Sequence, residues 1–346
     1  MKIRWGILSK YKNELYGMAI LWIMLLHGLV RDTHGILGPK FRDLTPILTH
    51  GNCGVDVFLF LSGIFLYFSF SKNHNIKFFF LKRFFRIFIP FIFITGSYWI
   101  YDNIICNHSI ILFIKNITFY SFWFGKVHFA WFIGAIALFY VLYPLIYKII
   151  YSTKLNNNSI FIFLMICVIY ISCYFLNHSG YFHAWYSNVE IALTRLPVFI
   201  LGCHIGKSVY ENRQINPFLL LISFFLILFG IYLFYHHYPI VPNYRILYFF
   251  VAPCLAIWFA VLLELFSNKY FNWIFAKLGI LSLELYLLQM ALQNLTLKFN
   301  FYSGNKVEIY HTYLIYCVIG AIIIAAIIHP LLDKIRMFII KNIPIK

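Results

Sequence analysis

Charged residues are scarce in this chain. Lys, Arg, Asp and Glu make up 11% of its 346 residues, whereas a soluble domain carries about 25%. Hydrophobic residues make up 62%, and the mean hydropathy is +0.80. A soluble fold of this length could not cover so much apolar surface, because much of any folded surface faces water. The composition excludes a water-soluble enzyme, a disordered chain and a secreted disulfide scaffold, and it predicts a polytopic integral membrane protein.

Other signals are missing as well. The seven cysteines form no Cys-x-x-Cys pair and most lie in apolar runs, so we expect small hydrophobes rather than disulfides or metal ligands. The first apolar run follows a basic stretch without a small-residue cleavage pattern, which predicts a retained span. We find no internal repeat, low-complexity linker or soluble domain, and we expect the longest polar stretches, 32–51 and 177–189, to be ordinary loops on the outer face. We therefore expect one transmembrane domain over residues 1–346, with no metal and no permanently bound cofactor.

Apolar runs of about 20 residues fit the ~30 Å hydrocarbon core of a bilayer as helices. The sequence contains ten such runs: 15–31, 52–71, 84–101, 128–150, 158–176, 190–209, 215–236, 245–266, 271–294 and 311–332. The segment 108–124 is apolar and aromatic but short, and we interpret it as interfacial or re-entrant, with an eleventh span as the alternative. The predicted fold class is an all-α bundle of about ten transmembrane helices.

The basic residues give the orientation of this bundle. With the N-terminus inside, nineteen Lys and Arg fall in inner segments and eight in outer ones. This asymmetry favours ten spans with both termini cytoplasmic. It also explains the net charge of +17 as membrane topology, so we expect contact with membrane lipid and no nucleic-acid partner. The predicted location is the plasma or inner membrane.

Ionisable residues at membrane depth are costly and therefore candidates for function. His27, near the outer end of the first run, could act as a general base on a hydroxyl; the alternative is a histidine that only bonds a neighbouring helix. Asp56 opens the second run, where it could orient His27 or favour the helix N-terminus through the dipole. In the same run, Ser62 is a weaker candidate for a direct role, and Gly63 predicts close helix packing.

Basic residues also cluster in the stretch KFFFLKRFFRIFIP at 77–90. Lys82, Arg83 and Arg86 lie at helical spacing and could bind the phosphates of an anionic cytoplasmic substrate. Topology and attraction to anionic lipid offer a simpler explanation of the same residues.

A buried arginine, Arg195, needs a partner, and Glu284 or Asp56 could supply a structural ion pair. Trp131 and Tyr140 belong either to an interfacial aromatic belt or to the lining of a pocket.

Taken together, these segments resemble the acyltransferase-3 family of multi-pass membrane proteins. The first run ending in His27, GVDVFLFLSG at 54–63 and LKRFFRIFIP at 81–90 are similar to successive family motifs, and AWFIGAIALFYVLYP, TRLPVFILG and LGILSLELYLLQ resemble later segments. The resemblance covers nearly the whole chain. It implies a membrane acyltransferase that modifies surface glycans or other extracytoplasmic acceptors.

The resemblance also implies roles for individual residues. His27 would be the catalytic histidine, Asp56 would belong to the active-site region, and Arg83 and Arg86 would help to bind the acyl donor. Two positions depart from the family pattern: Tyr16 stands where the family has an arginine eleven residues before the histidine, and Gln289 stands where many members have a second histidine. The candidates to replace the missing arginine are Arg4, Lys10 and Lys12.

The expected reaction is transfer of an acetyl group from cytoplasmic acetyl-CoA to a hydroxyl of a cell-surface or lipid-linked saccharide. Direct transfer and a covalent acyl relay both remain open, and the absence of a Gly-x-Ser-x-Gly motif favours direct transfer. A transporter or flippase of lipid-linked sugars is the main alternative, although such proteins often contain inverted repeats. A glycan polymerase or ligase ranks last because the loops are short.

Overall fold

The computed structural model describes residues 3–29, 45–125, 129–151, 158–236, 244–301 and 306–342. Within these ranges the chain is helical, and its one β-type contact is an isolated antiparallel bridge between Arg4 and Gln214. The predicted all-α membrane fold is confirmed in this respect. The chain divides into two compact units, made of residues 1–61 with 205–327 and of residues 62–204 with 328–346. The expectation of a single domain stays a prediction.

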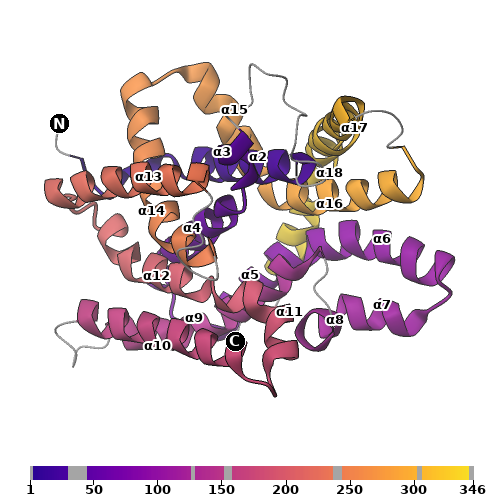
Figure 1. Cartoon of the computed structure of the whole chain (residues 1–346), viewed down its shortest axis with the longest axis horizontal. Helices are drawn as coiled ribbons and strands as arrows, with labels where there is room; N and C mark the ends of the chain where they lie inside the picture. Colours follow the sequence, from indigo (N-terminus) through magenta and orange to yellow (C-terminus); the bar gives the residue numbers. More distant parts are fainter. Residues whose placement is uncertain are drawn as a thin grey trace. The chain divides into compact units, whose positions relative to one another are not determined.

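The first unit contains both the N-terminal helices and most of the C-terminal ones. Its helices are α1 (Ile7–Lys10), α2 (Lys12–Leu29), α3 (Thr45–Thr49), the start of α4 (Cys53–Phe70), the end of α12 (Leu196–Tyr210), α13 (Pro217–His236), α14 (Tyr244–Phe266), α15 (Lys269–Ile280), α16 (Ser282–Lys298), α17 (Lys306–Tyr313), the π-helix η4 (Leu314–Ile319) and the start of α18 (Gly320–Asn342). In this unit α2 packs against α15 and α16 (Figure 1).

Close helix contacts hold α2 and α15 together. Gly17 of α2 faces the backbone carbonyl of Phe275, and Gly279 of α15 faces the carbonyl of Asn13. A Cβ atom at either glycine would overlap that carbonyl, so only glycine permits this approach. Residue numbers rise along α2 as they fall along α15 in these two contacts, so the two helices are antiparallel.

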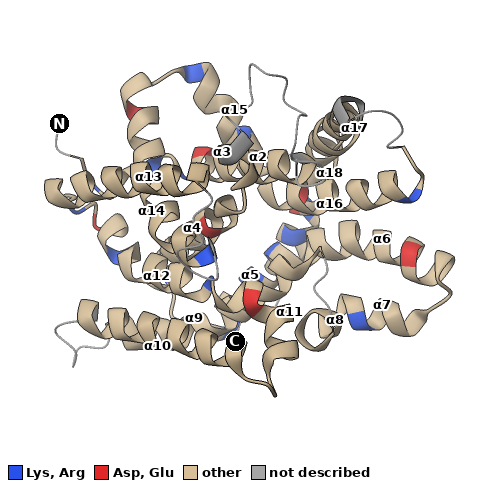
Figure 2. Ribbon diagram, viewed as in Figure 1, with Lys and Arg blue, Asp and Glu red and all other residues tan. Residues whose placement is uncertain are grey.

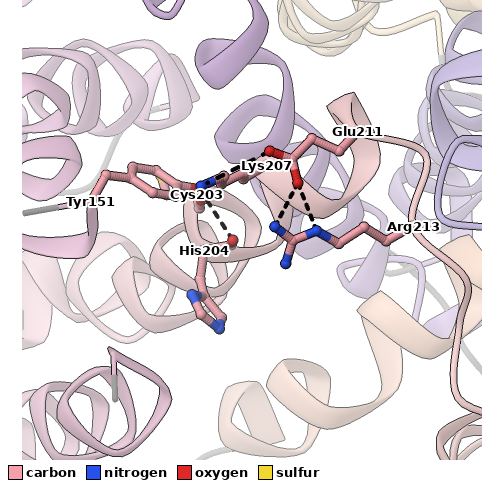
Figure 3. Close-up of polar contacts among 6 residues, drawn as sticks. All are labelled: Tyr151, Cys203, His204, Lys207, Glu211 and Arg213. Atoms are coloured by element: carbon pink, nitrogen blue, oxygen red, sulfur yellow. Dashed lines mark hydrogen bonds and ion pairs between the residues drawn. The ribbon is translucent and has the colours of Figure 1, made fainter. Parts of the chain in front are cut away.

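The second unit holds the central part of the chain. Its helices are the rest of α4, α5 (Ile76–Pro90), η2 (Phe91–Gly96), α6 (Ser97–Trp99), η3 (Ile100–Cys106), α7 (Ile110–Ile117), α8 (Tyr120–Phe124), α9 (Trp131–Tyr151), α10 (Asn158–His178), α11 (His183–Leu193), most of α12 and the end of α18. Gly63 of α4 packs on α12, where its Cβ would lie 2.7 Å from the Cys203 nitrogen, as predicted. The Tyr151 hydroxyl donates to the Cys203 and His204 carbonyls, which joins α9 to α12 (Figure 3).

Seven helices of the described residues are long and apolar enough to cross a membrane, and they match seven of the predicted runs. Charges are few along them (Figure 2). The run 271–294 forms the bent pair α15 and α16, which meet at 68° and could make an eighth span. The described part of the run 15–31, up to Leu29, is helical within α2, and the run 84–101 is helical in the segment from α5 to η3. The count of ten spans and the cytoplasmic placement of both termini stay predictions.

The segment 108–124 forms two short helices, α7 and α8, rather than one of span length. Phe119 between them has a left-handed backbone with φ of 60°, which interrupts the helix. At 1.5 Å per residue, neither helix could cross a hydrocarbon core. Most of the predicted outer loop 32–51, with Lys40 and Arg42, lies outside the described residues.

Candidate functional site

His27 lies near the C-terminal end of α2, where its side chain is partly buried. The next residue, Gly28, allows the Tyr313 ring to lie directly on α2, because a Cβ there would be 2.5 Å from the ring carbon Cδ1. Tyr313 ends α17 and immediately precedes the π-helix η4. Single π-helical turns often occur at functional sites, and here one follows the residue that packs beside His27.

The hydrogen-bond partner of the His27 ring is Gln289. Nδ1 lies 3.0 Å from the Gln289 Oε1 atom, and the Gln289 side chain is fully buried on α16. One turn further along α16, the Gln293 amide donates to the backbone carbonyl of His27 over 3.2 Å. No described residue hydrogen-bonds to His27 Nε2. One ring nitrogen is therefore held by a buried amide, while the other has no partner in the part of the chain that the structure describes.

Gln289 is itself held by two neighbours. Its Nε2 atom donates to the Tyr313 hydroxyl oxygen at 2.9 Å and to Gln293 Oε1 at 3.4 Å. The Tyr313 hydroxyl in turn donates to the Met24 carbonyl at 2.6 Å. Sequence reasoning noted Gln289 only as a departure from the family pattern, and it missed Gln293 and Tyr313. Two amides four residues apart in an apolar helix were the available signal, because they share one helix face.

Asp56 is 1% exposed in the first turn of α4. Near this turn α4 packs on α2, where the rings of Phe58 and Tyr16 lie 5.2 Å apart. The ring of His27 contacts Gln289, and the orienting role of Asp56 stays a prediction. A buried carboxylate in a first helical turn also suits the helix dipole. Tyr16, in place of the family arginine, is buried.

Glu284 lies in the first turn of α16, as Asp56 does in the first turn of α4. It follows the bend at Leu281 and is 5% exposed.

The structure also buries a histidine that sequence reasoning assigned to an ordinary loop. His50 lies between α3 and α4, stacks on Phe234 with ring centroids 3.9 Å apart, and has Nδ1 3.0 Å from the Tyr248 hydroxyl. Its position in a predicted polar loop gave no signal of burial.

The basic residues of α5 belong to the second unit. Lys82 and Arg86 are exposed, and Arg83 is partly buried. The Arg83 guanidinium lies 5.8 Å from the Phe79 ring centroid and 5.9 Å from that of Tyr140 in α9. Tyr140 thus contacts one of the predicted donor-binding residues. These distances fit cation–π contacts, which hold the Arg83 guanidinium near the two rings.

Arg195 lies between α11 and α12 and is 1% exposed. Its Nη1 atom donates to the Ile191 carbonyl at 2.8 Å, and its guanidinium lies 5.2 Å from the Trp131 ring centroid. Trp131 therefore contacts a buried cation, in addition to any role in an aromatic belt. Ser62, also predicted, is buried in α4 next to Gly63.

Three segments that the charge pattern assigns to the inner side meet in the first unit. Arg4 pairs with Gln214, and the Gly6 amide donates to the Asn212 side chain at 3.1 Å. Lys10 forms an ion pair with Glu264 at 2.5 Å, which raises the pKa of Lys10. Close to Gln214 in the sequence, the Glu211 carboxylate forms an ion pair with the Arg213 guanidinium, and it lies 3.9 Å from the Lys207 Nζ atom (Figure 3).

The described residues contain no group of three or more His, Cys, Asp or Glu that could hold a metal ion. Among known proteins, the family model described as an acyltransferase domain, that of the acyltransferase-3 family, matches residues 16–329. The match includes every predicted site residue. No curated protein and no solved structure matches the chain.

Proposed function

Because the chain belongs to the acyltransferase-3 family, and is thus a membrane acyltransferase, we propose that it is an O-acetyltransferase. Its donor is cytoplasmic acetyl-CoA, and its acceptor is a hydroxyl of a cell-surface or lipid-linked polysaccharide. We place it in the plasma or inner membrane, with about ten spans and both termini inside. The contacts among the N-terminal segment, the 211–214 loop and the end of α14 support one common side for these segments.

One observation carries the proposal: His27 has one ring nitrogen bound to a buried amide and the other without a partner among the described residues. A neutral imidazole with a free nitrogen can accept a proton at neutral pH. In the proposed reaction, Nε2 of His27 takes the proton of the acceptor hydroxyl while the oxygen of that hydroxyl attacks the thioester carbonyl. The C–S bond then breaks, and the imidazolium returns the proton to the CoA thiolate, so that the ester and free CoA leave a neutral ring.

Lys82, Arg83 and Arg86 are the proposed ligands of the donor phosphates. Arginine binds phosphate through two parallel hydrogen bonds, and lysine adds a point charge. The exposure of Lys82 and Arg86 supports this role, since a soluble donor must reach them from water. Asp56 is proposed to belong to the active-site region, and Ser62, Trp131, Tyr140, Arg195 and Glu284 to line the pocket or to stabilise it through structural contacts.

The test uses the purified protein in lipid vesicles with acetyl-CoA and the surface polysaccharide of cells that lack the gene. Release of CoA thiol and appearance of O-acetyl groups by NMR are measured together. We expect His27→Ala to abolish both signals while the protein remains folded, and the exposed histidine variant His178→Ala to retain them. Full acetylation by His27→Ala would refute the assignment.

The donor site is tested in the same assay. Arg86→Gln should raise the KM for acetyl-CoA with little change in kcat, because it removes binding shared by ground and transition states. Lys77→Gln, on the first turn of the same helix, is the matched charge control. The alternative function, a transporter or flippase of lipid-linked sugars, predicts movement of the saccharide across vesicles without CoA release.

A further inference from the structure

The hydrogen bonds around His27 form a closed loop of contacts that begins and ends on α2. Met24 and His27 lie three residues apart on α2, and Tyr313 and Gln289 join them from the end of α17 and from α16. Gln289 is fully buried, and Tyr313 is 2% exposed. Because water has little access to these groups, each of them must find its partners within the protein.

The direction of donation along this loop of hydrogen bonds is fixed by the Met24 carbonyl. The Met24 carbonyl oxygen can only accept, so the single Tyr313 hydroxyl proton points to it. Towards Gln289, the Tyr313 oxygen must therefore accept, and the amide nitrogen of Gln289 donates. This leaves the amide oxygen of Gln289 facing Nδ1 of His27.

An amide oxygen carries no proton, so Nδ1 must donate the hydrogen bond to it. A neutral imidazole has one N–H, and it is therefore on Nδ1, with the lone pair on Nε2. Gln293 reinforces this arrangement, because its Oε1 atom also accepts from the Gln289 amide nitrogen at 3.4 Å. Turning the amide over would place its oxygen against the Gln293 oxygen and lose both donated bonds.

We propose that Gln289 is a positioning residue that selects the basic nitrogen of His27, and that Tyr313 sets the orientation of Gln289. The amide does here what a carboxylate does in a hydrolytic triad, namely orient the ring and choose its tautomer, without adding a negative charge. The inference rests on the proposed function for its catalytic consequence. The tautomer itself can be observed without any reaction.

The direct test is NMR of protein labelled with ¹⁵N-histidine in lipid bilayers, with the His27 signals assigned from the His27→Ala spectrum. We expect the unprotonated nitrogen of wild-type His27 to be Nε2. Gln289→Leu, which has similar size and no acceptor, should give a mixture of the two tautomers. Gln289→Glu retains an acceptor opposite Nδ1 and should restore the wild-type tautomer. Thr296→Val lies on the same buried stretch of α16, where the hydroxyl donates to the Leu292 and Gln293 carbonyls and lies 3.7 Å from Cys317 Sγ, and it should change nothing.

The kinetic test measures acetyl transfer from acetyl-CoA to the purified polysaccharide. Gln289→Leu should lower kcat about tenfold with KM unchanged, as expected for loss of one orienting hydrogen bond. Tyr313→Phe should have a smaller effect alone and none in the Gln289→Leu background, since it acts through the amide. This non-additivity distinguishes a relay from two independent packing defects.

The outcomes separate the two proposals. If the wild-type ring carries its proton on Nε2, or if Gln289→Leu retains both the tautomer and kcat, the positioning role is wrong whatever the reaction. If the tautomer depends on Gln289 as described but wild-type protein transfers no acetyl group, the positioning role stands and the proposed function fails. If Gln289→Leu does not fold, the Tyr313→Phe and Gln289→Glu spectra decide the same question.

Discussion

The contact between α2 and α15 makes a sharp prediction about Gly17. In Gly17→Ala, the new Cβ would overlap the backbone carbonyl of Phe275. A backbone atom cannot turn aside as a flexible side chain can, so the two helices must separate. Overpacking of this kind typically costs about 1–3 kcal/mol, and alanine regains up to about 1 kcal/mol of helix propensity over glycine. Because the overlap is with a backbone atom, its cost lies at the upper end of that range, and subtracting the gain in helix propensity leaves a net loss of about 2 kcal/mol.

The measurement is thermal unfolding of the purified protein in detergent, followed by tryptophan fluorescence. Gly17→Ala should lower Tm by several degrees. Gly320→Ala is the control: it adds the same methyl group to a helix of the same unit, where its nearest neighbour would be 3.7 Å away. Gly279→Ala should resemble Gly17→Ala, and the double variant should lose less than the sum, because both act on one crossing. Equal Tm values for Gly17→Ala and Gly320→Ala would refute the close approach.

Two further predictions concern stability. The hydrogen bond with Glu264 raises the pKa of Lys10. This pair therefore stabilises the fold at neutral pH and loses its effect as pH rises through the raised pKa. The difference in Tm between wild type and Glu264→Gln should narrow in alkaline buffer, and a constant difference would contradict this. Ser223→Ala removes the buried acceptor of the Trp258 indole N–H, 2.9 Å away, and should cost about 1 kcal/mol in thermal unfolding. Ser187→Ala, at an exposed site, should cost nothing measurable.

Much of the fold could be predicted from the sequence, because a bilayer imposes a length on apolar runs. The runs 52–71, 158–176, 215–236 and 245–266 each became a long helix with nearly the expected bounds. The break in 271–294 could not be predicted in this way. Its residues are apolar on both sides of Leu281, so hydropathy does not distinguish one straight helix from two that meet at an angle.

The candidate site was predictable only in part. His27 and Asp56 attract notice because a charge in an apolar run is unusual. Gln289 attracts less, since a neutral amide costs less to bury, and its contact with His27 spans 262 residues of sequence. No local pattern indicates such a pairing. The burial of His50 was missed for the opposite reason: the surrounding polar residues suggest a solvated loop.

The pairing of α2 with α15 and α16 also has a consequence for biosynthesis. His27 in α2 is synthesised 262 residues before Gln289, its hydrogen-bond partner in α16. At about 5–20 residues per second, it waits roughly 13–50 s before Gln289 is synthesised. During that interval the insertion machinery or lipid headgroups must accommodate the polar residues Lys12, Asn13 and Glu14. Membrane insertion of this protein should therefore depend strongly on intact C-terminal helices. Chains truncated before Lys269 should be substrates for quality-control proteases.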